Sequence, residues 1–224
     1  PNAPTGKAIT LKEIEEILGL NKVAVHRLLT TLENRSFVER VGNKYVVGLK
    51  MVELSSMKLN KIELKTEAAP YLRELVNVLK QPIQMAILDD YEAVFIEKMQ
   101  SVNTLRMYSQ IGRRIPLYCS AVGKSLILQQ SDDEIFKKLS KQKFEKFTHK
   151  TLETPEQVLK EVQKARETGY TIDNEEHEVG IFCIAVPIYD YREKIIAAIS
   201  TAGTNKSFID ESNQQIQELI KSTG

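Results

Sequence analysis

Cysteine is scarce in this sequence and long hydrophobic runs are absent, and each shortage excludes a class of protein. The 224 residues contain only two cysteines, Cys119 and Cys183, which lie 64 positions apart without a CxxC pair. A disulfide framework needs more cysteines, so we expect a protein of the reducing cytoplasm. No run approaches the roughly 18 apolar residues of a membrane helix, and no signal-peptide pattern opens the chain. We therefore expect no membrane partner.

The chain also has little net charge, but the charge is unevenly distributed. Overall, 31 Lys and Arg against 30 Asp and Glu give +1. Residues 1–62 carry ten basic and six acidic side chains, or +4, which leaves 21 basic and 24 acidic side chains, or −3, for the remainder. A basic head on an acidic body indicates contact with a polyanion, although chance alone can give a difference of this size.

Motifs for nucleotide hydrolysis and cysteine catalysis are incomplete. Gly123-Lys124-Ser125 matches the end of the phosphate-binding pattern GxxxxGK[ST], but Tyr118 stands where its first glycine belongs and Pro116 interrupts the preceding strand. Cys183 follows His177 by six residues without the further signature of a cysteine nucleophile. Nucleotide hydrolysis and cysteine catalysis are therefore not expected.

One acidic run could hold a metal ion. Residues 173–178, Asp-Asn-Glu-Glu-His-Glu, combine carboxylates with one imidazole, and both are metal ligands. Such a run is more often a solvated turn. We therefore expect no metal, no cofactor and no catalytic residue, and an enzyme is the least favoured class.

The first 35 residues predict two short helices joined by a turn. Leu11, Ile14, Ile17 and Leu18 have helical spacing, Thr10 and Glu13 form a capping-box pattern, and Gly19 is a stop signal. A second helix follows Asn21 as its N-cap, with Val25, Leu28, Leu29 and Leu32 as the predicted buried stripe. Two helices connected in this way form a helix-turn-helix unit.

A β-hairpin follows the second helix and completes a winged helix. Residues 37–41 and 45–47 have strand character around a turn at Gly42. In such modules the second helix enters the major groove and the hairpin contacts the backbone. We assign phosphate contacts to Lys22, Arg27, Arg35 and Lys44, and contacts with base edges or sugar to His26, Thr30 and Thr31. A winged helix that contacts only proteins is the alternative.

The remainder predicts an α+β domain with one sheet flanked by helices. Helices are expected at residues 49–60 and 63–80, at 120–130 and 132–139, and from a cap at Thr154 to a stop at Gly169. Strands are expected at "IQMAILD", "AVFIEKM", "TLRMYS", "YTID", "FCIAVPIYD" and "KIIAAIST", and "IDESNQQIQELIKST" is expected to close the chain as a helix.

The N-terminal pattern resembles the DNA-binding domain of the IclR family of bacterial transcriptional regulators. That family's second helix typically reads Lys-Ser-Thr-Val-His-Arg-Leu-Leu-x-x-Leu, and here the stretch begins Lys22-Val23-Ala24-Val25-His26-Arg27. Tyr45 to Gly48 match the family's Tyr-x-x-Gly. Two departures are present: Val23-Ala24 replaces a Ser/Thr pair, and the family helix that precedes Ile9 falls before the start of this sequence.

The second half resembles the same family over its full length. "GRRIPLYCSAVGKSLI", "GYTIDNEEHEVGIFCIAVPIYD" and "AAISTAG" match family motifs in the same order. The resemblance implies a GAF-like domain that binds a small effector, often an organic acid or aromatic metabolite. Position by position it implies an effector site lined by Met107, Ala121, Val122, Asp173, Ile181, Cys183, Ser200 and Ala202. Ser200, Cys183 and the N–H groups near Ala121 are expected to meet a carboxylate.

Together these patterns predict three segments: a winged helix-turn-helix DNA-binding domain at residues 1–48, a linker helix at 49–62 and the GAF-like effector domain at 63–224. We expect a homodimeric or homotetrameric transcription factor that binds a double-stranded DNA operator and responds to an organic or sugar acid. The alternative is a metabolite sensor or protein-interaction module with a degenerate DNA-binding head, which the Val23-Ala24 departure motivates.

Overall fold

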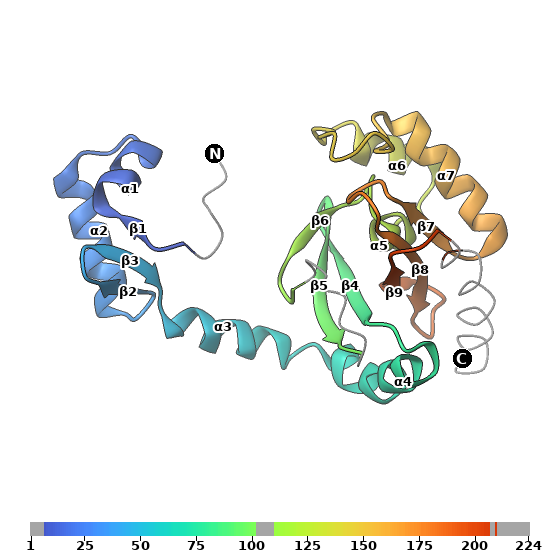
Figure 1. Ribbon diagram of the computed structural model, residues 1–224, viewed down its shortest axis with the longest axis horizontal. Coiled ribbons are helices and arrows are strands. Elements are labelled where there is room, and N and C mark those ends of the chain that lie inside the picture. The colour runs from blue at the N-terminus through green and yellow to red at the C-terminus, as the bar shows by residue number, and fades with distance from the viewer. Residues whose placement is uncertain (1–6, 102–109, 207–208, 210–224) are drawn as a thin grey trace. The chain divides into compact units, whose positions relative to one another are not determined.

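The computed structural model describes residues 7–101, 110–206 and 209, and they fall into two compact units, residues 1–64 and 65–224 (Figure 1). The strand expected at "TLRMYS" and the closing helix after Ile209 lie outside the described residues. No helix in the described part is both long enough and apolar enough to cross a bilayer.

The first unit is a winged helix followed by one further helix. Its elements are β1 (Ile9–Thr10), α1 (Leu11–Leu18), α2 (Lys22–Asn34), β2 (Val38–Val41), β3 (Lys44–Val47) and α3 (Leu49–Leu59). The three strands form an antiparallel sheet in the order β1-β3-β2. The prediction did not include β1, whose two residues are too few to show a strand pattern.

Local signals set the ends of α1 and α2, as the sequence predicted. Thr10 caps α1 in a capping box with Glu13, and Gly19 ends the helix with a left-handed φ of 64°. The Asn21 side chain accepts a hydrogen bond of 2.9 Å from the Ala24 N–H at the start of α2. These contacts satisfy helix N–H groups that would otherwise lack partners.

Only two of the four residues predicted to form the buried stripe of α2 are buried. Val25 and Leu29 are buried together with Tyr45 of the wing. Leu28 and Leu32 were also expected in the core, but they are 52% and 40% exposed. The core of this small unit is narrow, so only one side of the α2 stripe reaches it.

The second unit is built on a six-stranded antiparallel sheet in the order β6-β5-β4-β9-β8-β7. Its helices are α4 (Glu63–Leu79), α5 (Ala121–Leu126), α6 (Asp132–Leu139) and α7 (Pro155–Thr168). Its strands are β4 (Ile83–Asp89), β5 (Glu92–Met99), β6 (Arg114–Pro116), β7 (Thr171–Asn174), β8 (Phe182–Tyr189) and β9 (Ile195–Gly203). The predicted α+β architecture is confirmed.

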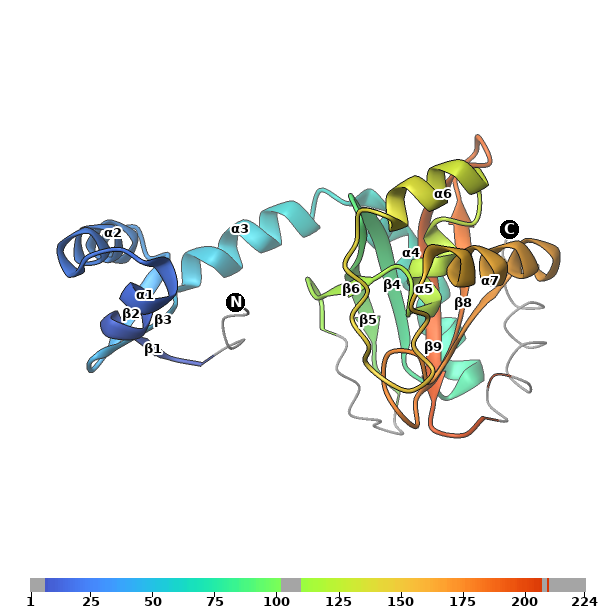
Figure 2. The ribbon, with the colours of Figure 1, turned by 90° about the horizontal axis from the view of Figure 1, so that it is seen from above.

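Helices cover both faces of this sheet. Figure 2 shows α5, α6 and α7 on one side and α4 on the other. On the α5 side, Ala86, Ala185 and Ala198 are buried in the main core, where their small side chains let α5 approach. On the α4 side, Leu75 and Leu79 of the helix line a small cavity beside Ile83, Ile184 and Ile199 of the sheet.

Two elements of this unit differ from the predictions. The helix expected at 120–130 is shorter, because α5 ends at Leu126 and Ile127 leaves the helical conformation. Strand β6 was not expected. It is an edge strand that pairs only with β5, and this position tolerates Pro116, since proline has no N–H to donate to a neighbouring strand.

Candidate functional site

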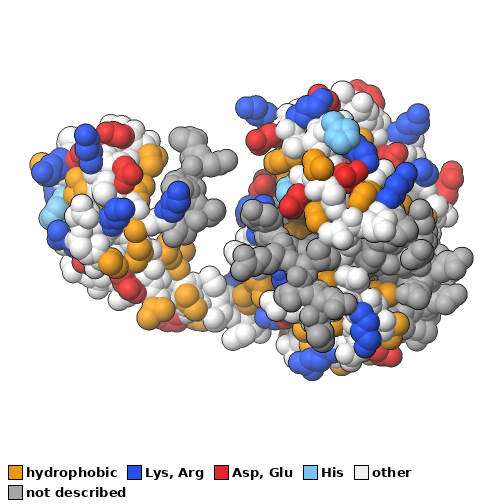
Figure 3. Space-filling view, in the orientation of Figure 1, with side chains coloured by type: hydrophobic (Ala, Val, Ile, Leu, Met, Phe, Trp, Pro, Cys, Tyr) orange, Lys and Arg blue, Asp and Glu red, His pale blue; other side chains and the backbone are white. Residues whose placement is uncertain are grey.

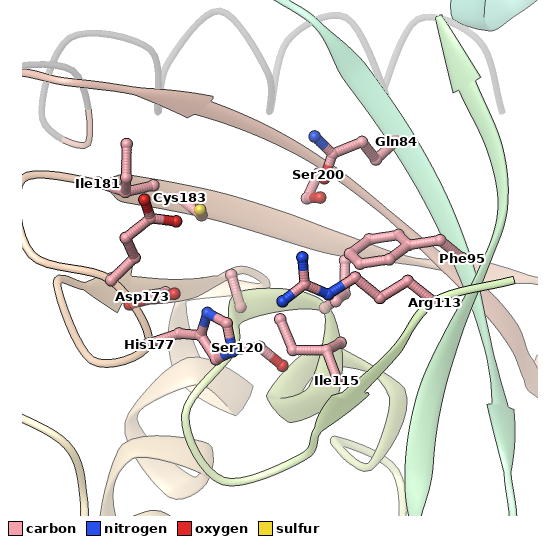
Figure 4. Close-up of a pocket in the computed structure, with 13 residues that line it drawn as sticks. Gln84, Phe95, Arg113, Ile115, Ser120, Asp173, His177, Ile181, Cys183 and Ser200 are labelled. Carbon is pink, nitrogen blue, oxygen red and sulfur yellow. The ribbon is translucent and has the colours of Figure 1, made fainter. Parts of the chain in front are cut away.

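A cavity lies between the sheet of the second unit and the start of α5 (Figure 4). Its volume is about 60 Å³, which is smaller than the roughly 300–1,000 Å³ of a typical small-molecule site. Six residues of the implied effector site line it: Ala121, Val122, Asp173, Ile181, Cys183 and Ser200. They come from α5, β7, β8, β9 and the loop before β8.

The other two residues of the implied site do not line the described cavity. Met107 lies outside the described residues. Ala202 is buried on β9, directly across from Cys183 in β8, but its short side chain is not among those that line the cavity. Residues outside the implied effector site also line the cavity: Gln84, Phe95, Arg113, Ile115, Ser120, His177 and Glu178.

Lys124 of the Gly-Lys-Ser stretch forms a buried ion pair. Its Nζ donates hydrogen bonds of 2.7 Å to both carboxylate oxygens of Glu176. The Lys124 side chain is 1% exposed and that of Glu176 is 8% exposed. Gly123 is needed because a Cβ there would lie 2.5 Å from the Leu117 Cα. The stretch therefore packs α5 against its neighbours and fixes the loop after β7.

Asp173 on β7 is the buried acid of the cavity wall. Its Oδ1 accepts a 2.7 Å hydrogen bond from the Glu176 N–H, and its backbone pairs with Cys183 of β8. Burial, and then the negative charge of Glu176, raises the pKa of Asp173 from 3.8 to about 7. This carboxyl group therefore changes charge near neutral pH.

The acidic run around Asp173 is not the solvated turn that was expected. Glu176 is buried against Lys124, and Glu175 forms an ion pair with Lys150. The His177 ring lies against the Phe147 ring, with 4.7 Å between the centroids. Across the described ranges, no cluster of three or more His, Cys, Asp or Glu side chains is arranged to hold a metal ion.

Neither cysteine is placed to act as a nucleophile. Burial is the main cause that raises the pKa of the Cys119 and Cys183 thiols, and the nearby negative charge of Asp173 adds to it. Both thiols therefore stay protonated and neutral near pH 7, whereas a reactive cysteine needs its thiolate. Cys183 serves as part of the cavity wall.

In the first unit, all seven residues assigned to DNA contacts are exposed: Lys22, His26, Arg27, Thr30, Thr31, Arg35 and Lys44. Figure 3 shows Lys, Arg and His side chains gathered on the visible face of this unit. The Thr30 and Thr31 hydroxyls donate 2.9 Å hydrogen bonds to the carbonyls of His26 and Arg27. These two hydroxyls keep only acceptor capacity, so His26, Arg27 and Lys22 are the stronger donors on α2.

Comparisons with known proteins give matches to both units. The family model for the IclR helix-turn-helix domain matches residues 3–42, and the model for the bacterial transcriptional regulator IclR C-terminal domain matches residues 56–224. The HTH-type transcriptional regulator KdgR of Escherichia coli K12 is 35% identical over 216 residues, which cover 96% of this chain and 82% of KdgR.

Solved structures agree with these matches. The Thermotoga maritima IclR crystal structure has a TM-score of 0.76 at 27% identity. The match covers 99% of this chain and 89% of the Thermotoga maritima chain. An IclR homologue from Microbacterium hydrocarbonoxydans, crystallised with 4-hydroxybenzoate, has a TM-score of 0.81 at 21% identity. The match covers 97% of this chain and 90% of the homologue's chain. At 21% identity, the similarity to the Microbacterium structure shows a shared fold and nothing more specific.

Proposed function

This chain belongs to the IclR family of bacterial transcriptional regulators, and from that premise we propose how it binds DNA and what controls its binding. The chain is a regulator and not an enzyme. The observation that carries the proposal is the match of IclR models to both units, together with a cavity in the second unit that six residues of the implied effector site line. Nothing in these comparisons favours the alternative of a degenerate DNA-binding head.

We propose that α2 is the recognition helix and enters the major groove of an operator. Its exposed Lys22 and Arg27 would neutralise phosphates, with Arg35 and with Lys44 of the wing. His26 is also exposed on α2 and would reach base edges or sugar. Thr30 and Thr31 would contribute as acceptors only.

We propose that the cavity of the second unit binds an organic or sugar acid as effector. The cavity combines apolar groups, from Phe95, Ile115 and Ile181, with polar groups such as Ser200, as small-molecule sites do. An effector can change operator affinity only if it binds one arrangement of the protein better than another. Operator binding and effector binding are then coupled, and the coupling is reciprocal.

We propose that the protein acts as a homodimer or homotetramer in the cytoplasm, where its DNA target lies. Along α3, Leu49 is 73% exposed, Val52 60% and Met57 53%. Apolar side chains at this density on one helix favour burial against another subunit. A symmetric pair of recognition helices would match a palindromic operator.

Arg27→Ala is expected to weaken operator binding roughly tenfold or more at low salt, because one phosphate contact is lost. The loss should be similar for all DNA sequences, and the slope of log affinity against log salt should fall by about 1. Fluorescence anisotropy of a labelled duplex, selected from random sequence by the wild-type chain, measures both quantities.

Arg192→Ala is the matched control, since Arg192 is an exposed arginine in the second unit and should leave both quantities unchanged. If Arg27→Ala bound the duplex as tightly as the control and with the same salt slope, α2 would not be the DNA-binding helix.

A further inference from the structure

A hydrophobic side chain lies on the outward face of α2. Val23 is the second residue of this helix and is 69% exposed, although valine is among the residues most often buried in proteins. With 3.6 residues per turn, Val23, Arg27 and Thr30 follow one another along one side of the helix. Val25 and Leu29 are buried on the opposite side. Val23 therefore shares the face that carries two of the residues assigned to DNA contacts.

The start of α2 fixes the position of Val23. The Asn21 side chain accepts a hydrogen bond of 2.9 Å from the Ala24 N–H, and the Asn21 carbonyl accepts one of 3.1 Å from the Val25 N–H. The Val25 side chain is buried with Tyr45 of the wing. A valine in a helix strongly favours one χ1 rotamer. Val23 is thus a rigid apolar group that loses little conformational freedom when it makes a contact.

The bases of DNA differ in what they offer to such a group. In the major groove, thymine presents an apolar group, its C5-methyl, whereas adenine, guanine and cytosine present hydrogen-bond donors and acceptors. A valine set against those polar groups covers them without bonding to them, which costs free energy. An apolar side chain at this place therefore favours thymine and disfavours the other three bases.

An apolar protein surface is the alternative partner for Val23. Leu18 and Leu20, which precede α2, are also exposed, and exposed apolar side chains can mark a protein contact. Val23, however, follows Lys22 directly and lies one turn before Arg27, and both of these side chains are exposed. Two positive charges beside an apolar group fit a polyanion that also presents methyl groups, and duplex DNA combines the two.

We propose that Val23 contacts the C5-methyl group of a thymine in the operator and is a specificity-determining residue of α2. This inference rests on the proposal that α2 enters the major groove, and it adds a residue that was not assigned to DNA. Lys22 and Arg27 contribute affinity for any sequence through the phosphates. Val23 contributes preference for one base, and burial of one methyl group is worth about fourfold in affinity.

Fluorescence anisotropy of the full chain tests the assignment, with the duplex that the wild-type chain selects from random sequence. Uracil replaces thymine at one position at a time, which removes the C5-methyl group and leaves base pairing unchanged. We expect at least one position at which uracil weakens wild-type binding about fourfold. With a cytosine at the same position, 5-methylcytosine should restore about the same factor.

Two valine variants identify the side chain responsible. Val23→Ser should bind the thymine and uracil duplexes equally well at that position, because the hydroxymethyl group offers little apolar surface. Val179→Ser is the matched control, since Val179 is a valine of the second unit that is 65% exposed. It should keep the fourfold preference for thymine.

The assignment is wrong if uracil weakens wild-type binding at no position, or if Val23→Ser keeps the preference for thymine at every position. Arg27→Ala separates this failure from failure of the proposed recognition helix. If Arg27→Ala weakens binding and Val23→Ser leaves base preference unchanged, α2 binds DNA but Val23 does not recognise thymine. If neither variant changes DNA binding, α2 is not the DNA-binding helix and both proposals are wrong.

Discussion

Replacing Lys124 with methionine is expected to lower the free energy of unfolding of the second unit by about 3–5 kcal/mol at pH 7. The methionine fills much of the same volume but leaves Glu176 buried without its counterion. Glu176 accepts two hydrogen bonds of 2.7 Å from the Lys124 ammonium and is itself buried. Urea denaturation followed by circular dichroism measures the loss.

Two variants make this result specific. Lys124→Met combined with Glu176→Leu should recover most of the lost stability, because neither member of the pair is then left as a buried charge without its partner. Lys12→Met removes an exposed pair with Glu16, whose atoms are 4.0 Å apart, and should cost less than about 1 kcal/mol. A loss for Lys124→Met no larger than that for Lys12→Met would contradict the structural role of the pair.

Asp173→Asn is expected to stabilise the protein at pH 8 and to leave it almost unchanged at pH 4. The folded protein holds the Asp173 proton up to a pKa of about 7, whereas the usual value is 3.8. Between these values the folded state binds more protons at Asp173 than the unfolded state does, so the contribution of Asp173 to wild-type stability falls as pH rises from about 4 to 7 and is level above. The fall contributed by Asp173 is on the order of 4 kcal/mol.

Asparagine removes this pH dependence because it is neutral throughout and its carbonyl can still accept from the Glu176 N–H. Urea denaturation of both proteins from pH 4 to pH 8 checks the sign. The difference between them should grow with pH and favour the asparagine variant. An asparagine variant destabilised equally at every pH would show that Asp173 is ionised in the folded protein, as a partner of a positive charge.

The winged helix was predictable because its signals are local. The caps at Thr10 and Asn21 and the stop at Gly19 each act within four residues of the helix end that they set. The same holds for α7, which runs from its cap at Thr154 to Gly169 as expected. By contrast, the exposure of Leu28 depends on how wide the core of the unit is, which no local pattern reports.

The cavity was predictable only in part, because it is assembled from distant segments. The family resemblance brought six residues to one cavity that periodicity alone would not connect. It did not indicate Arg113, because the sequence does not show which of the two adjacent arginines, Arg113 or Arg114, lines the cavity. Nor did it indicate the pair of Lys124 with Glu176, whose members lie 52 residues apart and meet only when β7 packs beside α5.

Operator affinity of the full chain, measured with and without the bound acid, tests most directly whether the cavity of the second unit controls DNA binding by the first. The duplex is the one that the chain selects from random sequence, and the acid is whichever of gluconate, lactate or 4-hydroxybenzoate binds the protein. We expect salt-dependent binding that the acid changes by roughly 5-fold to 150-fold, and a smaller response in Ser200→Ala. Operator affinity that is the same with and without the acid, or no salt-dependent binding at all, would contradict this mechanism.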